Sequence, residues 1–230
     1  MNIQALIFDF DGLLVDTETP QLTAWQNIYR AHGARLLLEE WVKCLGTSAD
    51  AFDPIRDLHS KTPLPIDGER LRAEFKARSI EAIQKENLRP GIETLLEQAR
   101  QRNLRMAVAS SSNRTWVESG LNRLHAADYF DVICTSNDVT RVKPDPELFL
   151  LALDRLGIDS NEAIVFEDSP MGIQAAKSAN LACVAYPNAI SVHLDLRQAD
   201  LVIPSLVDYP LVKILQVFDG YRPDLSHSSD

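Results

Sequence analysis

The 230-residue sequence has few cysteines, a deficit of basic residues and no long apolar run. Cys44, Cys134 and Cys183 are far apart and lack C-x-x-C spacing, so they predict buried, inert thiols rather than disulfides or a zinc site. No run reaches the roughly 18 apolar residues of a membrane span, so no membrane partner is expected. The 33 acidic residues outnumber 23 basic ones, giving a net charge of −10. This excess argues against nucleic-acid binding, because phosphate backbones attract basic surfaces.

Two catalytic signatures are also missing from the sequence. No G-x-x-x-x-G-K-[ST] loop occurs, which excludes nucleotide binding by a P-loop. No G-x-S-x-G elbow occurs, and the five histidines lie outside the polar loops described below, so a serine or cysteine triad would lack its base. The apolar N-terminal run is interrupted by aspartates and follows no basic region, which predicts a strand rather than a signal peptide and a cytoplasmic location.

Short apolar runs alternate with helical patterns from about residue 90 onward. Consecutive apolar residues predict strands buried on both faces, and apolar positions three and four apart predict helices between most of them. The pattern indicates a doubly wound α/β core with a parallel sheet. The expected strands are 3–8, 104–109, 131–134, 163–166, 181–185 and 200–203, and the expected helices are 92–102, 114–124, 146–156, 171–179 and 206–217.

Residues 17–88 interrupt this alternation with helical patterns alone, at 20–32, 38–45, 49–59 and 67–86. The simplest interpretation is an all-helical domain inserted after the first strand, with 1–16 and 89–230 forming the core. We expect hinges at both junctions. The three tryptophans, Trp25, Trp41 and Trp116, are expected in the core rather than against a substrate, since two fall on apolar helical stripes.

Acidic residues follow two of the predicted strands. Asp9 and Asp11 end the run LIFDFDG, and Glu167 and Asp168 follow the run AIVF. Ligands gather at the carboxyl ends of parallel strands, and carboxylates buried together there need a counterion. An oxygen-only donor set favours a hard cation, and a few carboxylates with water suit Mg²⁺. Gly12 permits a turn that aims Asp9 and Asp11 at one point, although helix caps or solvated acids are the alternative.

Two further loops predict an anion site at the same edge. Ser110 and Ser111 open the loop SSSN, whose hydroxyls and backbone N–H groups precede a helix N-terminus; an ordinary N-cap is the alternative. In VKPDPELF, Pro144 restricts Lys143 to an extended conformation, and a helix starts immediately afterward. Lys143 is therefore suited to hold a phosphate as a fixed point charge, the alternative being a solvated lysine.

A cation site, an anion site and a fixed lysine together indicate phosphate chemistry. Asp9 is the candidate nucleophile, which would form an aspartyl-phosphate. Asp11 is the candidate acid and base, which would protonate the leaving alkoxide and then deprotonate the hydrolytic water. Lys143, Ser110 and Mg²⁺ would balance the charge of the transferring group.

The D-x-D-G motif at 9–12, Ser110 after a strand, Lys143 in V-K-P-D-P and E-D-S at 167–169 resemble the haloacid dehalogenase superfamily. The resemblance is to its helical-cap subfamily, which includes β-phosphoglucomutase and sugar-phosphate phosphatases. It implies a Rossmann-like core and a cap that closes over the site. It also implies that Asp9, the backbone carbonyl of Asp11 and Asp168 hold Mg²⁺, with Glu167 behind them or as an occasional direct ligand.

Departures from the subfamily patterns reduce the number of activities that fit this sequence. Asp11 argues against dehalogenation, which needs no alkoxide protonation. Mutases carry a histidine where this sequence has Gln21, and basic residues where it has Leu45 and Ala49. These differences favour an Mg²⁺-dependent phosphatase, a monomer acting on a small phosphorylated metabolite such as a sugar or polyol phosphate. The alternatives are a β-phosphoglucomutase-type mutase and a non-catalytic regulator that retains the fold.

The cap loop is the expected specificity surface. It contains Gly46, Thr47 and Ser48, in the sequence CLGTSADAF. The alternative interpretation is a plain N-cap in which Thr47 or Ser48 starts the following helix.

Overall fold

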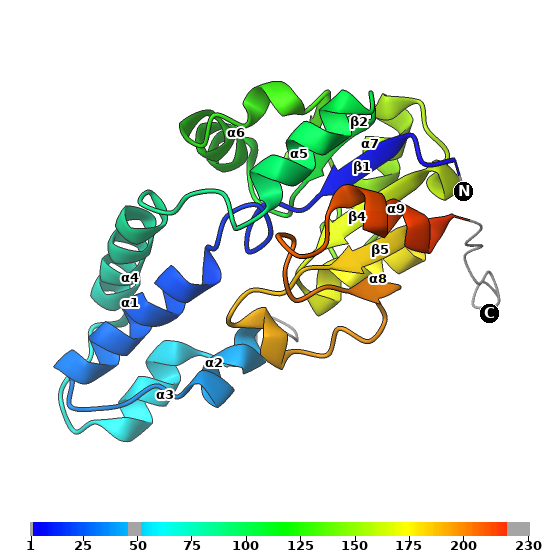
Figure 1. The fold of residues 1–230 in the computed structure, drawn as a ribbon. Coiled ribbons are helices and arrows are strands. Elements are labelled where there is room, and N and C mark those ends of the chain that lie inside the picture. Colours follow the sequence, from blue (N-terminus) through cyan, green and yellow to red (C-terminus); the bar gives the residue numbers. More distant parts are fainter. Residues whose placement is uncertain (1, 46–51, 220–230) are drawn as a thin grey trace.

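A parallel sheet organises the computed structural model, which describes residues 2–45 and 52–219 (Figure 1). Within these residues the sheet has six strands in the order β3-β2-β1-β4-β5-β6. The order reverses between β1 and β4, which makes their carboxyl ends the switch point where ligands bind in such sheets. The strands are β1 (Ala5–Phe8), β2 (Arg105–Ala109), β3 (Val132–Cys134), β4 (Ala163–Glu167), β5 (Ala182–Ala185) and β6 (Leu201–Val202).

Helices cover both faces of the sheet. Leu6 and Phe8 of β1 point into the cluster beneath α5, α6 and α9, whereas Ala5 and Ile7 point into the cluster beneath α7 and α8. This two-sided burial explains the unbroken apolar runs and confirms the predicted doubly wound α/β fold. The helices are α5 (Ile92–Gln101), α6 (Arg114–Arg123), α7 (Glu147–Leu156), α8 (Pro170–Ser178) and α9 (Leu211–Phe218).

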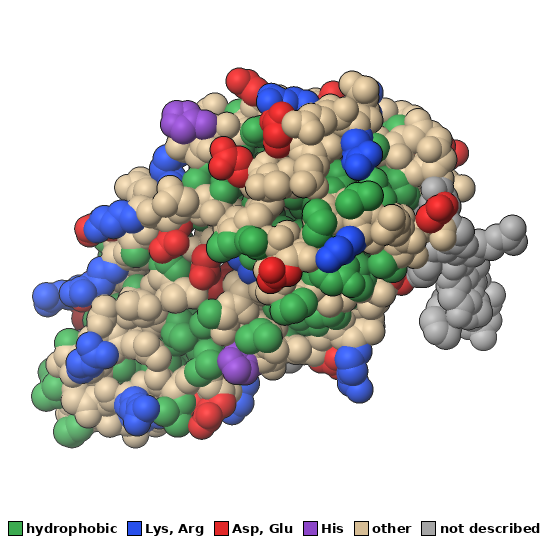
Figure 2. All heavy atoms as spheres, in the orientation of Figure 1, with side chains coloured by type: hydrophobic (Ala, Val, Ile, Leu, Met, Phe, Trp, Pro, Cys, Tyr) green, Lys and Arg blue, Asp and Glu red, His purple; other side chains and the backbone are tan. Residues whose placement is uncertain are grey.

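The first four helices after β1 form a separate lobe beside the sheet (Figure 1). Their cluster contains Trp25, stacked on Phe75 with ring centroids 4.8 Å apart, and the fully buried Leu58 and Tyr29. The lobe comprises α1 (Glu18–Ala31), α2 (Leu38–Leu45), α3 (Pro54–Lys61) and α4 (Gly68–Ile83). On the face shown in Figure 2, acidic and basic side chains are interspersed. Within residues 2–45 and 52–219, no helix has the length and apolarity that crossing a membrane requires.

Two chain segments connect the lobes and lie side by side. Val15 pairs with Leu88, and the Arg89 N–H donates to the Leu14 carbonyl at 2.9 Å. The buried Arg89 guanidinium then donates to three carbonyls, those of Gly12 at 2.7 Å, Tyr186 at 2.9 Å and Pro187 at 2.6 Å. The second connection is therefore fixed to the loops that follow β1 and β5.

Two helices start later than their sequence patterns predict. α3 begins at Pro54 rather than residue 49, because the Asp53 carboxylate accepts the Ile55 N–H at 2.9 Å and caps the helix there. α9 begins at Leu211 rather than residue 206, directly after Pro210. A proline is well suited to a helix start, so local chemistry sets both boundaries more sharply than apolar spacing does.

If residues 17–88 form a domain of their own, a cavity in the lobe should destabilise the lobe first. Leu58 in the lobe and Leu96 in the core are both fully buried. We expect Leu58→Ala to cost about 2–5 kcal/mol of local stability and to speed amide hydrogen exchange in α1–α4. The matched variant Leu96→Ala should speed exchange in β1 and β4. Equal acceleration of β1 and α1 by Leu58→Ala would contradict two separate domains.

Candidate active site

The turn after β1 fixes two acids at the switch point. The Asp9 N–H donates to the Phe166 carbonyl of β4 at 3.0 Å, which extends the pairing of the two strands by one residue. Gly12 has φ +82°, and a Cβ there would lie 2.5 Å from Asp168 Oδ2. Only glycine therefore fits this turn, which holds Asp9 and Asp11 beside the end of β4.

Lys143 forms a buried ion triad with acids from two strands. Its Nζ lies 2.5 Å from Asp9 Oδ1 and 2.7 Å from Glu167 Oε1, and all three side chains are at least nine-tenths buried. The Lys143–Pro144 peptide bond is cis, and α7 starts at Glu147, whose N–H donates to Asp145 Oδ1 at 3.1 Å. Burial disfavours the ammonium ion and would lower the pKa of Lys143. The two neighbouring carboxylates have the larger effect and raise this pKa.

The loop after β4 arranges Glu167 and Asp168. Glu167 Oε2 accepts the Asp168 N–H at 2.9 Å and the Ser169 N–H at 3.1 Å. Ser169 caps α8, since its Oγ accepts the Gly172 N–H at 3.1 Å. Asn188 Nδ2 donates to Asp168 Oδ2 at 2.8 Å. Both carboxylates are thus held by hydrogen bonds rather than by solvent.

Three of these acids suit a divalent cation. Asp9, Glu167 and Asp168 each offer one carboxylate oxygen within 4.8 Å of the others. Burial raises the pKa of Asp9 to about 7, against the attraction of Lys143, and burial raises the pKa of Asp168 well above its usual value. One lysine cannot neutralise three carboxylates. The oxygen-only donor set therefore fits a hard cation such as Mg²⁺.

Asp11 is oriented from α6 and from the loop before it. Ser112 Oγ donates to its Oδ2 at 2.6 Å, and the Trp116 indole N–H donates to its Oδ1 at 2.8 Å. Burial nevertheless raises the pKa of Asp11. Trp116 packs against the core, as expected, but the sequence did not predict its hydrogen bond to Asp11. Its position in the first turn of α6 was the available signal, because a helical side chain lies over the turn that precedes it.

The serine loop lies on the same cavity as the acids. Ser110 is almost fully buried, its N–H donates to the Cys134 carbonyl at 3.0 Å, and its Oγ accepts the Ser112 N–H at 3.0 Å. Asn113 caps α6 by accepting the Trp116 N–H at 2.9 Å, so the N-cap and a site-facing loop coexist. The cavity measures about 620 Å³, and its lining includes Asp9, Asp11, Ser110, Ser111, Lys143, Glu167 and Asp168.

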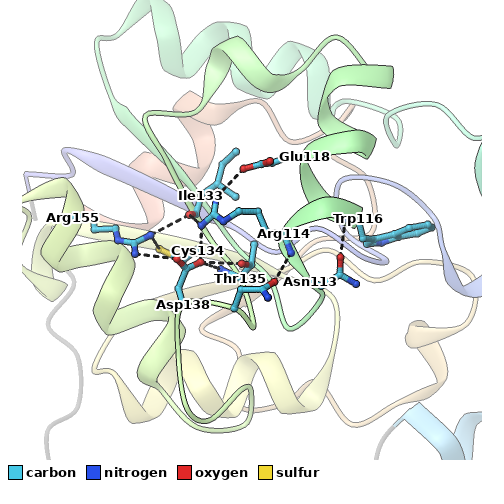
Figure 3. Close-up of polar contacts among 10 residues, drawn as sticks. Asn113, Arg114, Trp116, Glu118, Ile133, Cys134, Thr135, Asp138 and Arg155 are labelled. Atoms are coloured by element: carbon cyan, nitrogen blue, oxygen red, sulfur yellow. Dashed lines mark hydrogen bonds and ion pairs between the residues drawn. The ribbon is translucent and has the colours of Figure 1, made fainter.

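A polar network anchors the start of α6 to the loop after β3 (Figure 3). Asp138 accepts from Arg114 at 2.7 Å, from Arg155 at 3.1 Å, and from the N–H and hydroxyl of Thr135 at 2.9 Å each. Partial burial would raise the pKa of Asp138, but the hydrogen bonds from Thr135 and the two arginines lower it to about 2. Motif analysis did not identify this network, since its members come from separate elements.

The helical lobe also contributes to the cavity, through Glu18 and Gln21 of α1. Gly46, Thr47 and Ser48, predicted to set specificity, lie outside the described residues. Cys134 and Cys183 are buried, and burial raises the pKa of both thiols, to about 11 for Cys134. These two cysteines are therefore thiols rather than thiolates at neutral pH.

Comparisons with known proteins find one family and several relatives. The family described as haloacid dehalogenase-like hydrolase matches residues 6–186. A Bacillus subtilis protein named phosphatase YhcW is 39% identical over 213 residues, which is 93% of this chain and 96% of that protein. A Thermotoga maritima protein named phosphorylated carbohydrates phosphatase is 34% identical over 181 residues, covering 78% and 82%. A crystal structure of β-phosphoglucomutase from Clostridium difficile superposes with a TM-score of 0.72 at 27% identity, covering 95% and 98%.

Gly172 makes the position of Glu167 sensitive to a single methyl group. A Cβ at Gly172 would lie 1.7 Å from Glu167 Oε1, the atom that binds Lys143. We expect Gly172→Ala to lower the free energy of unfolding by about 1–3 kcal/mol, because the buried carboxylate must move. Urea denaturation checks this, with Gln174→Ala on the exposed face of α8 as the control. Equal stability of the two variants would contradict the close approach.

The Asp138 network should contribute stability only while Asp138 is ionised. Its pKa is lowered from an unfolded value of about 3.9 to about 2, so the contribution is complete above pH 4 and disappears as the pH falls through 2. We expect Asp138→Asn to cost about 1–2 kcal/mol at pH 7, and the difference from the wild type to shrink between pH 4 and pH 2.

Asp195 supplies the matched control for Asp138. Hydrogen bonds from Arg197 lower its pKa to about 2 as well, but its side chain is 58% exposed. Surface ion pairs contribute little, so Asp195→Asn should leave the free energy of unfolding nearly unchanged at every pH. A cost for Asp138→Asn that persists at pH 2 would show that its role is not that of a carboxylate.

Proposed function

The chain belongs to the haloacid dehalogenase-like hydrolase family and is a phosphatase, and we propose that it hydrolyses a small sugar or polyol phosphate through an aspartyl-phosphate with the help of Mg²⁺. One observation carries the proposal. The Asp9 carboxylate lies against a buried ammonium group, beside two further acids, at the sheet switch point. The loop containing Ser110 opens on the same cavity.

Asp9 is the nucleophile in this proposal. Its carboxylate oxygen forms a bond to phosphorus while the bond from phosphorus to the ester oxygen breaks. Lys143 favours the ionised form of Asp9 by direct contact, against the burial that raises the pKa of Asp9, and compensates negative charge on the transferring group. Ser110 and Ser111 bind the phosphoryl oxygens from the opposite loop. In this proposal Lys143 has two roles, one toward Asp9 and one toward the phosphate.

Asp11 is the acid and base. Its raised pKa favours the protonated form before reaction, as donation to a leaving alkoxide requires. The same carboxylate then takes a proton from the water that hydrolyses the aspartyl-phosphate. Hydrogen bonds from Ser112 and Trp116 hold it at the cavity wall, two residues from the nucleophile.

Asp9, Asp168 and the backbone carbonyl of Asp11 would hold Mg²⁺. When bound, the ion supplies positive charge that favours the ionised carboxylates and offsets the charge of the phosphoryl group. Glu167 already has one oxygen on Lys143 and the other on the Asp168 and Ser169 N–H groups. We assign it to orienting Lys143 and Asp168, with direct metal binding as the lesser role.

Residues 17–88 act as the cap in this proposal, since α1 places Glu18 and Gln21 on the cavity. The carbohydrate-phosphate phosphatase of Thermotoga supports a phosphorylated sugar or polyol as substrate. A mutase is the second candidate, because the chain superposes on a β-phosphoglucomutase. Gln21 at the position of the mutase histidine, on the cavity wall, favours water as the phosphoryl acceptor.

Asp9→Asn should abolish turnover and retain the fold, because an amide matches the carboxylate in shape but is not a nucleophile. We expect phosphate release from a panel of sugar and polyol phosphates to require Mg²⁺ and to fall about 10³-fold or more in the variant. Asp208→Asn, an exposed aspartate outside the cavity, is the control. Appreciable activity of Asp9→Asn in Mg²⁺ would remove Asp9 from its role.

The same panel separates the two candidate activities. β-Glucose 1-phosphate is tested with a parallel coupled assay for glucose 6-phosphate. Phosphate release supports the phosphatase acting on that sugar. Formation of glucose 6-phosphate without net phosphate release would establish the mutase instead.

A further inference from the structure

Glu18 is a cavity residue to which the proposed reaction gives no role. It is the first residue of α1, at the point where the chain enters the helical lobe. Its side chain lines the same cavity as Asp9 and Asp11, but from the lobe rather than from the sheet. Glu18 therefore lies across the cavity boundary from the residues proposed to act on the phosphate.

One oxygen of Glu18 is buried without a partner. Oε2 is shielded from solvent and has no hydrogen-bond partner among the described residues. An unsatisfied buried polar atom costs about 1–3 kcal/mol, so it is usually retained for a function. Two other such atoms, Thr17 Oγ1 and Trp41 Nε1, belong to residues that do not line the cavity. Glu18 therefore differs from them in belonging to the cavity wall as well.

The charges around Glu18 restrict what that molecule can be. Burial, reinforced by Asp11, Asp16 and Asp9, raises the pKa of Glu18 to about 8. A protonated carboxyl group both donates and accepts a hydrogen bond, which matches a hydroxyl group. Lys143 is the single cationic side chain on the described cavity wall, and it is already paired with two carboxylates. A second anionic group on the substrate would meet acids and no free cation.

We propose that Glu18 determines substrate specificity by binding a hydroxyl group near the scissile phosphoester, and that it disfavours substrates carrying a second anion. The inference rests on the proposed phosphatase activity and defines its substrates as neutral polyol or sugar monophosphates. Glu18 is a specificity residue here and takes no part in the bond changes at phosphorus.

Three esters with the same carbon count test this assignment. Propyl phosphate has no hydroxyl group, glycerol 3-phosphate has two, and 3-phosphoglycerate has one hydroxyl group and a carboxylate. We expect Glu18→Ala to lower kcat/KM for glycerol 3-phosphate about tenfold, mainly through KM, and to change it less than about twofold for propyl phosphate. Glu18→Gln, which still donates and accepts, should retain most of the activity on glycerol 3-phosphate. Glu18→Ala should also raise kcat/KM for 3-phosphoglycerate relative to glycerol 3-phosphate.

The stability of the Glu18 variants distinguishes a binding role of this side chain from a packing role. Because Oε2 has no partner, neither Glu18 variant should unfold at a lower urea concentration than the wild type. Glu81→Gln is the matched control, since the Glu81 side chain is 72% exposed on α4. It makes the same amide substitution away from the cavity and should leave all three values of kcat/KM unchanged.

The outcomes distinguish this inference from the proposed function. Equal losses on propyl phosphate and glycerol 3-phosphate in Glu18→Ala would overturn the specificity role and leave the phosphatase standing. A loss of stability in both variants would likewise overturn it in favour of a packing role. If the wild type releases no phosphate from any of these esters or from the sugar phosphates, the proposed function fails, and this inference fails with it.

Discussion

The ion triad of Asp9, Lys143 and Glu167 is the interaction on which the site depends. Burying a charge is costly unless it is paired and hydrogen-bonded, and each member of the triad is paired with another. Removing one partner would leave an uncompensated charge in the interior, which is more damaging than replacing the whole group. Because the three residues come from the turn after β1, the end of β4 and the loop before α7, the triad also joins segments that are far apart in the sequence.

The sheet and its helices explain how such a costly arrangement is kept in place. Strands β1 and β4 are covered on both faces, so their ends have little freedom to move. Hydrogen bonds hold the polar loops at this edge of the sheet: Ser169 caps α8, Asn113 caps α6, and Asp138 ties α6 to the loop after β3. A rigid scaffold that carries polar loops at one edge is the usual basis of a positioned active site.

Sequence reasoning succeeded where the signal was local. D-x-D-G, V-K-P-D-P and E-D-S are contiguous motifs, and unbroken apolar runs distinguish two-sided strands, so the fold and the cluster of acids were predictable. Trp116, Arg89 and Asn188 were missed because they bond to residues of the site that lie 20 or more positions away in the sequence, and Asp138 because its bond to α6 spans 24 positions. No propensity or spacing encodes such pairings. Trp116 is the clearest example of what sequence reasoning could not predict. An aromatic residue on a helical stripe is ordinarily a core residue, and no motif indicates its bond to Asp11.

Arg89 has an electrostatic consequence beyond its structural one. Its guanidinium donates to three carbonyl oxygens and stacks on the Tyr186 ring at 3.8 Å. Among the described residues, no carboxylate hydrogen-bonds to this guanidinium. Burial lowers its pKa, but an arginine remains a cation. A full positive charge therefore lies beside the turn at Gly12 and acts on Asp168 at a distance. Two buried cations, Arg89 and Lys143, thus act on the acidic edge of the sheet, and its local potential is less negative than the count of carboxylates implies.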